Sequence, residues 1–274
     1  MNAVPRFETF TRLGFAARGV LYILIAYLAI AAGRNADSTD VLRSMAEGGA
    51  SRLVLGLIAL GLLAYGTWRC LEAAMDLEGA GPGAKGAATR LGHGMSGVAH
   101  GVMGLLAAGL ALGVVGSDGG GGQGADKATG LVMTLPAGGL LLRLVAVGFI
   151  LGGLAEGWSA YRLKFLEQLD PRAAARPWVR WVGRLGYIAR GIVFILIGLL
   201  LWKAAGAHNP DQAGGVGEAL GSLSGTHRIM VAGGLGFFGM FSLVQAVYRR
   251  ITNPHVLHRL EASLPSARAA ARRP

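Results

Sequence analysis

The stretch Arg12-Leu13-Gly14-Phe15-Ala16-Ala17-Arg18-Gly19 recurs nearly unchanged as Arg184-Leu185-Gly186-Tyr187-Ile188-Ala189-Arg190-Gly191. A third copy, Arg90-Leu91-Gly92-His93-Gly94-Met95-Ser96-Gly97, keeps the same frame, and each copy leads into a long apolar run. Self-similarity at a fixed period decides the architecture before any local pattern does. The chain is therefore predicted to contain three copies of one membrane-spanning unit.

The composition predicts a protein that lies in a lipid bilayer. Hydrophobic residues make up 53% of the 274 residues, charged residues make up 15%, and 46 residues are glycine. A soluble domain of this length is less apolar and less rich in glycine. Six segments are long enough to cross about 30 Å of hydrocarbon at about 1.5 Å per helical residue. They are residues 13–33, 53–75, 94–115, 138–161, 186–205 and 229–250.

The sequence thus predicts an all-α integral membrane protein with six transmembrane helices. Each repeat holds an even number of spans, so successive repeats enter the membrane from the same side. We expect three parallel two-helix hairpins in a pseudo-threefold arrangement. The repeats are expected at residues 1–76, 77–162 and 163–251, and a basic cytoplasmic tail at 252–274.

The distribution of basic residues predicts the orientation, because Lys and Arg near the ends of spans stay cytoplasmic. The side that holds both termini carries 19 Lys and Arg against 8 Asp and Glu, while the opposite side carries 7 against 7. Both termini are therefore predicted to be cytoplasmic. The excess charge lies in juxtamembrane loops, so the expected partners are anionic lipid headgroups and not nucleic acid.

Polar segments flank the spans on both sides. On the side opposite the termini, each hairpin loop contains an aspartate that is expected to cap a short surface helix: Asp37, Asp126 and Asp211. On the side of the termini, Pro177, Trp178 and Trp181 predict a short interfacial helix ahead of the fifth span.

Three motifs together resemble a known family. They are the three Arg-Leu-Gly openings, the linker Lys164-Phe165-Leu166-Glu167-Gln168-Leu169-Asp170, and the closing Ala246-Val247-Tyr248-Arg249-Arg250. This combination resembles the bacterial "domain of unknown function 1206" family over residues 5–251. The resemblance implies a six-span protein of the bacterial cytoplasmic membrane built from three repeats, and it implies no activity. The middle repeat departs from the family pattern, with Ser96 where arginine is usual and histidines where aromatic residues are usual.

Charged and polar residues inside the spans are the first candidates for a site. A charge near the centre of a span costs about 2.5–3.5 kcal/mol on an insertion scale, so it usually has a partner. Hairpin geometry predicts that Glu72 approaches Arg18 and that Gln245 approaches Arg190, with Glu156 at a comparable depth. Three interpretations stay open: glue between hairpins, a polar gate or solute site, and snorkelling to the headgroups.

A second candidate is the helical face around each intramembrane arginine. Offsets of three and four residues share a face, which places aromatic rings beside Arg18 and Arg190, where they can make cation–π contacts. The middle repeat has His93, Ser96 and His100 on that face, which favours either a protonatable or metal-binding lining or two packed histidines. No motif supports a metal or haem, so no cofactor is expected. The expected cavity lining is Tyr22, His93, Ser96, His100 and Tyr187.

Small residues predict where helices approach closely. Gly97 with Gly101, and Gly148 with Gly152, form small-xxx-small pairs that let helix backbones touch. We expect them to pack the middle hairpin near the centre of the bundle or against a partner subunit. Among the second spans, Tyr65-Gly66-Thr67-Trp68 is aligned with Glu156-Gly157-Trp158-Ser159 and with Phe238-Gly239-Met240-Phe241.

No catalytic motif is present: the chain has no nucleophile elbow, no His-Glu-x-x-His and no Walker sequence. An enzyme is not expected. The leading hypothesis is a solute- or lipid-binding protein of transporter or channel type, with a polar Arg/His/Glu cluster toward the cytoplasm. The alternative is a structural or accessory subunit that packs onto another membrane protein or onto further copies of itself.

Overall fold

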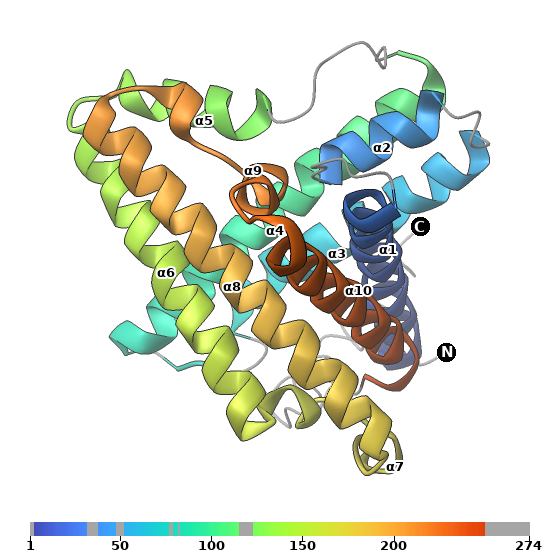
Figure 1. Cartoon of the computed structure of the whole chain (residues 1–274). Coiled ribbons are helices and arrows are strands. Elements are labelled where there is room, and N and C mark those ends of the chain that lie inside the picture. Colours follow the sequence, from blue (N-terminus) through green and yellow to red (C-terminus); the bar gives the residue numbers. More distant parts are fainter. Residues whose placement is uncertain are drawn as a thin grey trace, which may run out of the picture.

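The computed structural model describes residues 3–31, 38–47, 52–76, 79–81, 83–114 and 123–249. Within these residues the chain is helical, with one isolated bridge between Leu169 and Arg249. Six of the described helices are long and apolar enough to cross a membrane, which confirms the predicted fold class (Figure 1). They are α1 (Ala3–Ala31), α3 (Arg52–Met75), α4 (Ala84–Leu112), α6 (Gly138–Arg162), α8 (Pro177–Ala207) and α10 (Gly225–Tyr248).

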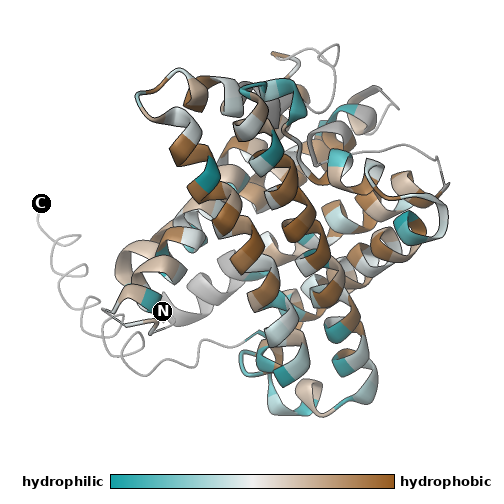
Figure 2. Ribbon diagram, turned by 60° about the vertical axis from the view of Figure 1, so that its left-hand side comes forward, coloured by the Kyte–Doolittle hydropathy of each residue, from teal (hydrophilic) through white to brown (hydrophobic). Residues whose placement is uncertain are grey.

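Three of these helices begin nine or ten residues before the expected spans. α1 begins at Ala3, α4 at Ala84 and α8 at Pro177, ahead of the predicted residues 13, 94 and 186. The separate interfacial helix expected before the fifth span is therefore wrong, because Trp178 and Trp181 belong to the first turns of a continuous α8. Apolar residues dominate the long helices, and hydrophilic residues gather toward their ends (Figure 2).

Short helices lie at both ends of the bundle. α2, α5 and α9 lie at the upper end in Figure 1, and α7 lies at the lower end. The expected aspartate caps are wrong for Asp126, which lies inside α5, and for Asp211, which lies inside η2; the side chain of Asn209 caps η2 instead. Asp37 lies outside the described residues. The short elements are α2 (Ser38–Glu47), α5 (Gln123–Met133), η1 (Lys164–Leu166), α7 (Pro171–Ala174), η2 (Pro210–Gln212) and α9 (Val216–Gly221).

The most extensive helix contacts join different repeats. α3 packs on α4, α6 packs on α8, and α10 packs on α1. Contacts within a hairpin are less extensive for α8 with α10 and for α1 with α3, and α4 scarcely touches α6. The spans thus follow one another in space as α4, α3, α1, α10, α8 and α6. A pseudo-threefold arrangement would give this order of contacts between repeats, and the symmetry itself stays a prediction.

A glycine pair marks each of the three contacts between repeats. In each first span it is the glycine that closes the repeated motif. A Cβ atom built on Gly19, Gly97 or Gly191 would lie 2.9, 2.8 or 2.7 Å from a carbonyl oxygen of the opposite helix. These distances leave no room for a side chain, so the backbones touch there. The opposite residues are Gly239, Gly66 and Gly153, in that order.

The middle hairpin is open where the other two are closed. A Cβ on Gly14 would meet the backbone of Tyr65 at 2.8 Å, and a Cβ on Gly186 would meet that of Phe238 at 2.6 Å. The corresponding glycine of the middle repeat, Gly92, has open space around it, as does Gly148 on the facing helix. The glycines that close the outer hairpins are therefore present in the middle one without a helix against them.

Two buried apolar clusters fill the described bundle. The larger one includes Leu21, Ile25 and Leu235 and extends to Leu42 of α2 and Leu220 of α9. The smaller one lies at the opposite end and consists of Phe165, Leu169, Val179, Phe241 and Val244.

Candidate intramembrane polar site

Arg18 of α1 is buried at the centre of this site, with 7% of its surface exposed. Its Nη1 donates to the hydroxyl of Tyr65 at 2.5 Å, its Nη2 donates to Oε1 of Gln245 at 2.7 Å, and its Nε donates to Oγ of Ser242 at 3.2 Å. The guanidinium also lies 4.7 to 5.0 Å from the ring centroids of Phe15, Tyr65 and Phe238. Neutral acceptors and aromatic faces therefore hold this buried cation.

The expected pairing within hairpins is wrong. Arg18 contacts Gln245 of the third repeat and not Glu72, and Gln245 does not contact Arg190. The reason is the helix order, because α1 crosses α10 closely at Gly19 while Tyr65 fills the space between Arg18 and α3. Arg18 therefore contacts the second span of the third repeat. This is the repeat that precedes the first one if the three repeats are counted in a circle.

Arg190 of α8 follows the same rule. Its Nη1 donates to Oε1 of Glu156 in α6, and its guanidinium lies 4.4 Å from the ring centroid of Phe194 and 5.0 Å from that of Phe238. The two charged side chains are 18% and 17% exposed. Among the residues that the structure describes, Oε2 of Glu156 and Nε of Arg190 are buried atoms without a hydrogen-bond partner. The pair is thus neutral in sum and keeps one acceptor and one donor unused.

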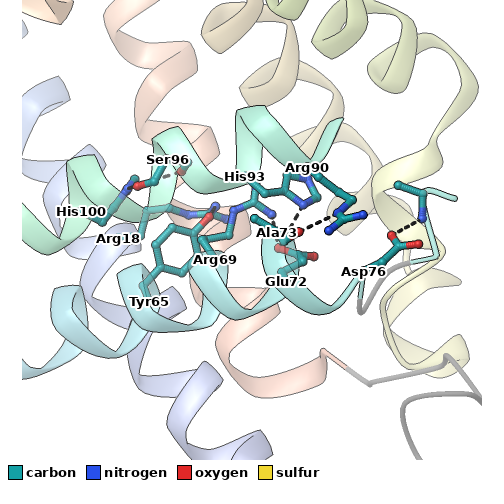
Figure 3. A network of polar contacts seen from close by, with 11 residues as sticks. Arg18, Tyr65, Arg69, Glu72, Ala73, Asp76, Arg90, His93, Ser96 and His100 are labelled. Atoms are coloured by element: carbon teal, nitrogen blue, oxygen red, sulfur yellow. Dashed lines mark hydrogen bonds and ion pairs between the residues drawn. The ribbon is translucent and has the colours of Figure 1, made fainter. Parts of the chain in front are cut away.

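Glu72 joins α3 to α4 on the other side of the bundle. Its side chain is 1% exposed, and its Oε2 lies 2.5 Å from Nη1 of Arg69 and 3.5 Å from Nδ1 of His93 (Figure 3). A buried carboxylate needs such partners, because an unpaired charge in a medium of low polarity is costly. His93 therefore contacts a carboxylate of the neighbouring helix.

His100 connects α4 to the Arg18 cluster. Its ring lies edge-on to Tyr65, 4.6 Å between centroids, and its Nδ1 lies 2.7 Å from the backbone oxygen of Ser96. Tyr65 in turn accepts from Arg18, so ring and polar contacts run from α4 through α3 to α1 (Figure 3). His93 and His100 meet different partners. Among the described residues, no group of three or more His, Cys, Asp or Glu side chains could hold a metal ion.

Tyr22 and Tyr187, two residues of the expected cavity lining, pack around Phe238. Their ring centroids lie 4.9 and 5.5 Å from that of Phe238, in edge-on geometry. Tyr187 also stacks on Phe165 at 4.9 Å. Aromatic rings of α1, α8 and α10 therefore pack against one another around Phe238.

The crossing glycines correct the alignment of the second spans. Gly153 meets Gly191 as Gly66 meets Gly97 and as Gly239 meets Gly19, so the alignment through Gly157 is shifted by one turn. In the corrected register, Arg69, Glu156 and Ser242 are equivalent. The contact between α3 and α4 therefore has its arginine, Arg69, on the second span of the first repeat and a serine, Ser96, on the first span of the middle repeat. This is the reverse of the contact between α10 and α1, where Ser242 lies on the second span and Arg18 on the first. If the second spans had been aligned on Gly66, Gly153 and Gly239, the sequence would have identified Arg69 and Ser242 as candidate site residues.

The first arginine of the repeated motif has a separate role. Arg90 donates from Nε to the carbonyl oxygen of Ala73 at 2.6 Å and from Nη2 to that of Ala74 at 3.1 Å. Arg184 donates from Nε to the carbonyl oxygen of Ala160 at 3.3 Å. Ala73 and Ala160 each lie seven residues after a crossing glycine. These arginines therefore satisfy carbonyl groups near the end of the preceding span.

The four glycines predicted to pack the middle hairpin divide into two groups. Gly97 and Gly101 face Gly66, where an added Cβ would meet backbone atoms of both at 2.8 Å. Gly152 is in ordinary contact with Phe194 at 3.6 Å, and Gly148 has open space around it. In the middle hairpin, α4 therefore packs closely on α3, and α6 packs closely on α8 through Gly153.

The repeats coincide with matches to known sequences. The family model described as Domain of Unknown Function (DUF1206) matches three times, over residues 13–76, 91–162 and 185–249. The uncharacterised protein YxxB of Bacillus subtilis (strain 168) is 30% identical over 260 residues, which covers 90% of this chain and 93% of that protein. No solved structure matches the chain.

Proposed function

We propose a function from the premise that this chain, a multi-pass membrane protein, belongs to the family described as Domain of Unknown Function (DUF1206). The protein binds an amphiphilic solute or lipid, in the manner of a transporter or channel, at the pair formed by Arg190 and Glu156. It acts in the bacterial inner membrane with both termini in the cytoplasm. The proposal assigns no chemical reaction to the site.

One observation carries this proposal, which is the difference in exposure between two parts of the polar site. Arg18, Glu72 and Gln245 are 7%, 1% and 2% exposed as whole residues. The side chains of Arg190 and Glu156 are both partly exposed, at 18% and 17%, whereas in the pair of Arg69 and Glu72 the arginine is 19% exposed and the carboxylate only 1%. A buried charge that only held helices together would be expected in the first group. A partly exposed pair inside a span is by default a candidate functional site.

The open middle hairpin supports a route from the bilayer to this pair. Glu156 lies on α6 and His100 lies on α4, and these two helices are the ones that scarcely touch. Gly92 and Gly148 have open space where the other hairpins are closed by a facing helix. A ligand with an apolar tail could enter sideways between the two helices without leaving the hydrocarbon.

The chemistry of the pair indicates the type of headgroup. The charges of Arg190 and Glu156 cancel, so a strongly charged ion gains little there. Oε2 of Glu156 can accept a hydrogen bond and Nε of Arg190 can donate one, but both atoms are buried, so a headgroup that bonds to them must displace the groups that cover them. A headgroup with both a donor and an acceptor, such as a hydroxyl, amide or zwitterion, fits this arrangement.

Filling the opening tests the proposal. Leucine in place of Gly148 would occupy the open space on α6. The matched control is Gly56→Leu, which adds the same side chain to a glycine of α3 that also has open space around it. The purified full chain and both variants would be compared by mass spectrometry of the lipids and amphiphiles that they retain in detergent. We expect Gly148→Leu to lose a component that the wild type and Gly56→Leu keep. Identical retention by all three would contradict the proposal.

The exposure of α4 and α6 supports a second candidate, an accessory or scaffold protein. Their most apolar windows are 22% buried, against 39% to 56% for the other four spans. A membrane-protein partner or a second copy of the chain would cover these helices. Cross-linking in native membranes tests this candidate, which predicts a stable adduct from α4 or α6 and intact ligand retention by Gly148→Leu.

A further inference from the structure

A cleft of about 270 Å³ lies where α8 begins and α6 ends, away from the polar site described above. It is lined by Leu163, Pro177, Arg180, Trp181 and Arg184. Four of these residues belong to the first turns of α8, and Leu163 directly follows α6. In Figure 1 this region lies at the lower end of α8, beside α7.

The cleft carries two positive charges one helical turn apart. Arg180 donates from Nε to the carbonyl oxygen of Ala174, and Arg184 donates from Nε to that of Ala160, both at 3.3 Å. These bonds fix each guanidinium while its two terminal nitrogens remain for another acceptor. In the described part of the chain, neither arginine forms an ion pair with a carboxylate. Like charges at this spacing repel one another unless an anion lies between them.

Aromatic residues place the cleft at the depth of lipid headgroups. Trp181 is 60% exposed and Trp178 is 46% exposed, and exposed tryptophans at the end of a span lie at the membrane–water boundary. The guanidinium of Arg184 lies 5.6 Å from the ring centroid of Trp181. Leu185, the next residue of α8, is also exposed. A lipid could therefore place its phosphate at the arginines and its chains along the apolar surface of α8.

The repeat scaffold does not require these residues. Arg184 has a counterpart in every repeat, but the positions that correspond to Arg180 hold Glu8 and Gly86. Those that correspond to Trp181 hold Thr9 and Ala87. The second arginine and the tryptophan are thus particular to the third repeat, and the role of Arg184 in bonding Ala160 does not account for them.

We propose that this cleft binds the phosphate of an anionic phospholipid headgroup, with Arg180 and Arg184 as its ligands and Trp181 beside it. Guanidinium groups present paired donors that match phosphate oxygens. One phosphate between two arginines also removes their mutual repulsion. This site is independent of the proposed function, because it shares no residue with the pair of Arg190 and Glu156.

The test measures how lipids stabilise the purified full chain in a neutral detergent. The melting temperature would be followed during titration with phosphatidylglycerol, phosphatidylcholine or inorganic phosphate. The variant is Arg180→Gln, which alters an exposed side chain. The matched control is Arg162→Gln, an exposed arginine that lies over Trp158 outside the cleft. A cooperative melting transition without lipid would show that both variants are folded.

We expect phosphatidylglycerol to stabilise the wild type at lower concentration than phosphatidylcholine does. Loss of one arginine contact of about 1 kcal/mol corresponds to about a fivefold rise in the half-saturating concentration, for Arg180→Gln and not for Arg162→Gln. Equal effects of the two lipids, or equal losses in the two variants, would overturn the site. If inorganic phosphate stabilised the protein as much as phosphatidylglycerol does, the cleft would bind a soluble anion, and the proposal of a lipid ligand would be overturned.

Discussion

Arg18 in α1 donates a hydrogen bond from Nη2 to Oε1 of Gln245 in α10 at 2.7 Å, so the first and the last spans are joined inside the bundle. The same guanidinium reaches Tyr65 of α3, which joins a third helix to the contact. A single buried side chain therefore connects three neighbouring helices, α3, α1 and α10. The stability of the protein should depend strongly on this connection.

Replacing Gln245 by leucine should lower the free energy of unfolding by about 1.5–3 kcal/mol, because it removes a hydrogen bond to a buried charge. Arg18→Met removes the charge itself. If the two residues interact, the double variant should lose less stability than the sum of the single variants. Unfolding by sodium dodecyl sulfate in mixed micelles measures these differences. Thr67→Ala, which changes an exposed hydroxyl on α3, serves as the control; strictly additive losses would show that Arg18 and Gln245 act separately.

Gly153→Ala should destabilise the protein by about 1–3 kcal/mol, the usual range for overpacking. The added Cβ would lie 2.5 Å from the carbonyl oxygen of Gly191, so α6 and α8 would have to move apart. Gly157 lies one turn further along α6 with open space around it, and Gly157→Ala should be neutral or slightly stabilising. The same unfolding titration compares the two. A loss in both variants would indicate a general intolerance of α6 and not a helix crossing.

Glu156→Leu should lower the free energy of unfolding by about 3–5 kcal/mol, because it leaves the charge of Arg190 without its carboxylate inside the span. The double variant with Arg190→Leu should recover much of this loss, since no charge is then left unpaired. Glu167→Leu, which changes an exposed carboxylate in the loop after α6, is the control. Failure of the double variant to recover stability would mean that Arg190 has another partner.

The repeated motif and the apolar runs were sufficient to predict the class of fold. Six spans and three repeats follow from residue type and spacing, which act locally within each helix. The partner of Arg18 did not follow, because the prediction assumed that the two spans of one hairpin pack most closely. Close approach depends instead on glycines of different repeats, such as Gly19 and Gly239.

The middle repeat shows why the candidate site was only partly predictable. Ser96 was read as the loss of an arginine, although Arg69 on the neighbouring helix supplies one. The sequence alignment matched Gly66 with Gly157 and so did not reveal Arg69. Gly153 and Gly157 are both glycines, so either of them can be aligned with Gly66. A shift of one helical turn preserves the apolar pattern of a span, so hydropathy cannot detect it. Only contact between helices selects Gly153.

The orientation of the protein stays a prediction that labelling can test. In a Cys70→Ala background, cysteines at Ala84 and Ala175 should resist an impermeant thiol reagent in intact cells, because both positions are predicted to lie on the cytoplasmic side. A cysteine at Ser224, which is exposed at the opposite end of α10, should react. Permeabilised cells provide the control, since all three cysteines should react there. The reverse pattern in intact cells would invert the topology.

The contact between α1 and α10 has a consequence for biosynthesis. The ribosome releases α1 first, but the helix that packs on it most extensively, with Gln245 and Ser242, is the last span to be made. Until then, Arg18 must remain in or near the membrane with only the partners that α3 offers. Such late, long-range pairing slows assembly and leaves intermediates open to degradation. Quality control in the cell therefore has its longest opportunity before residues 225–248 are inserted.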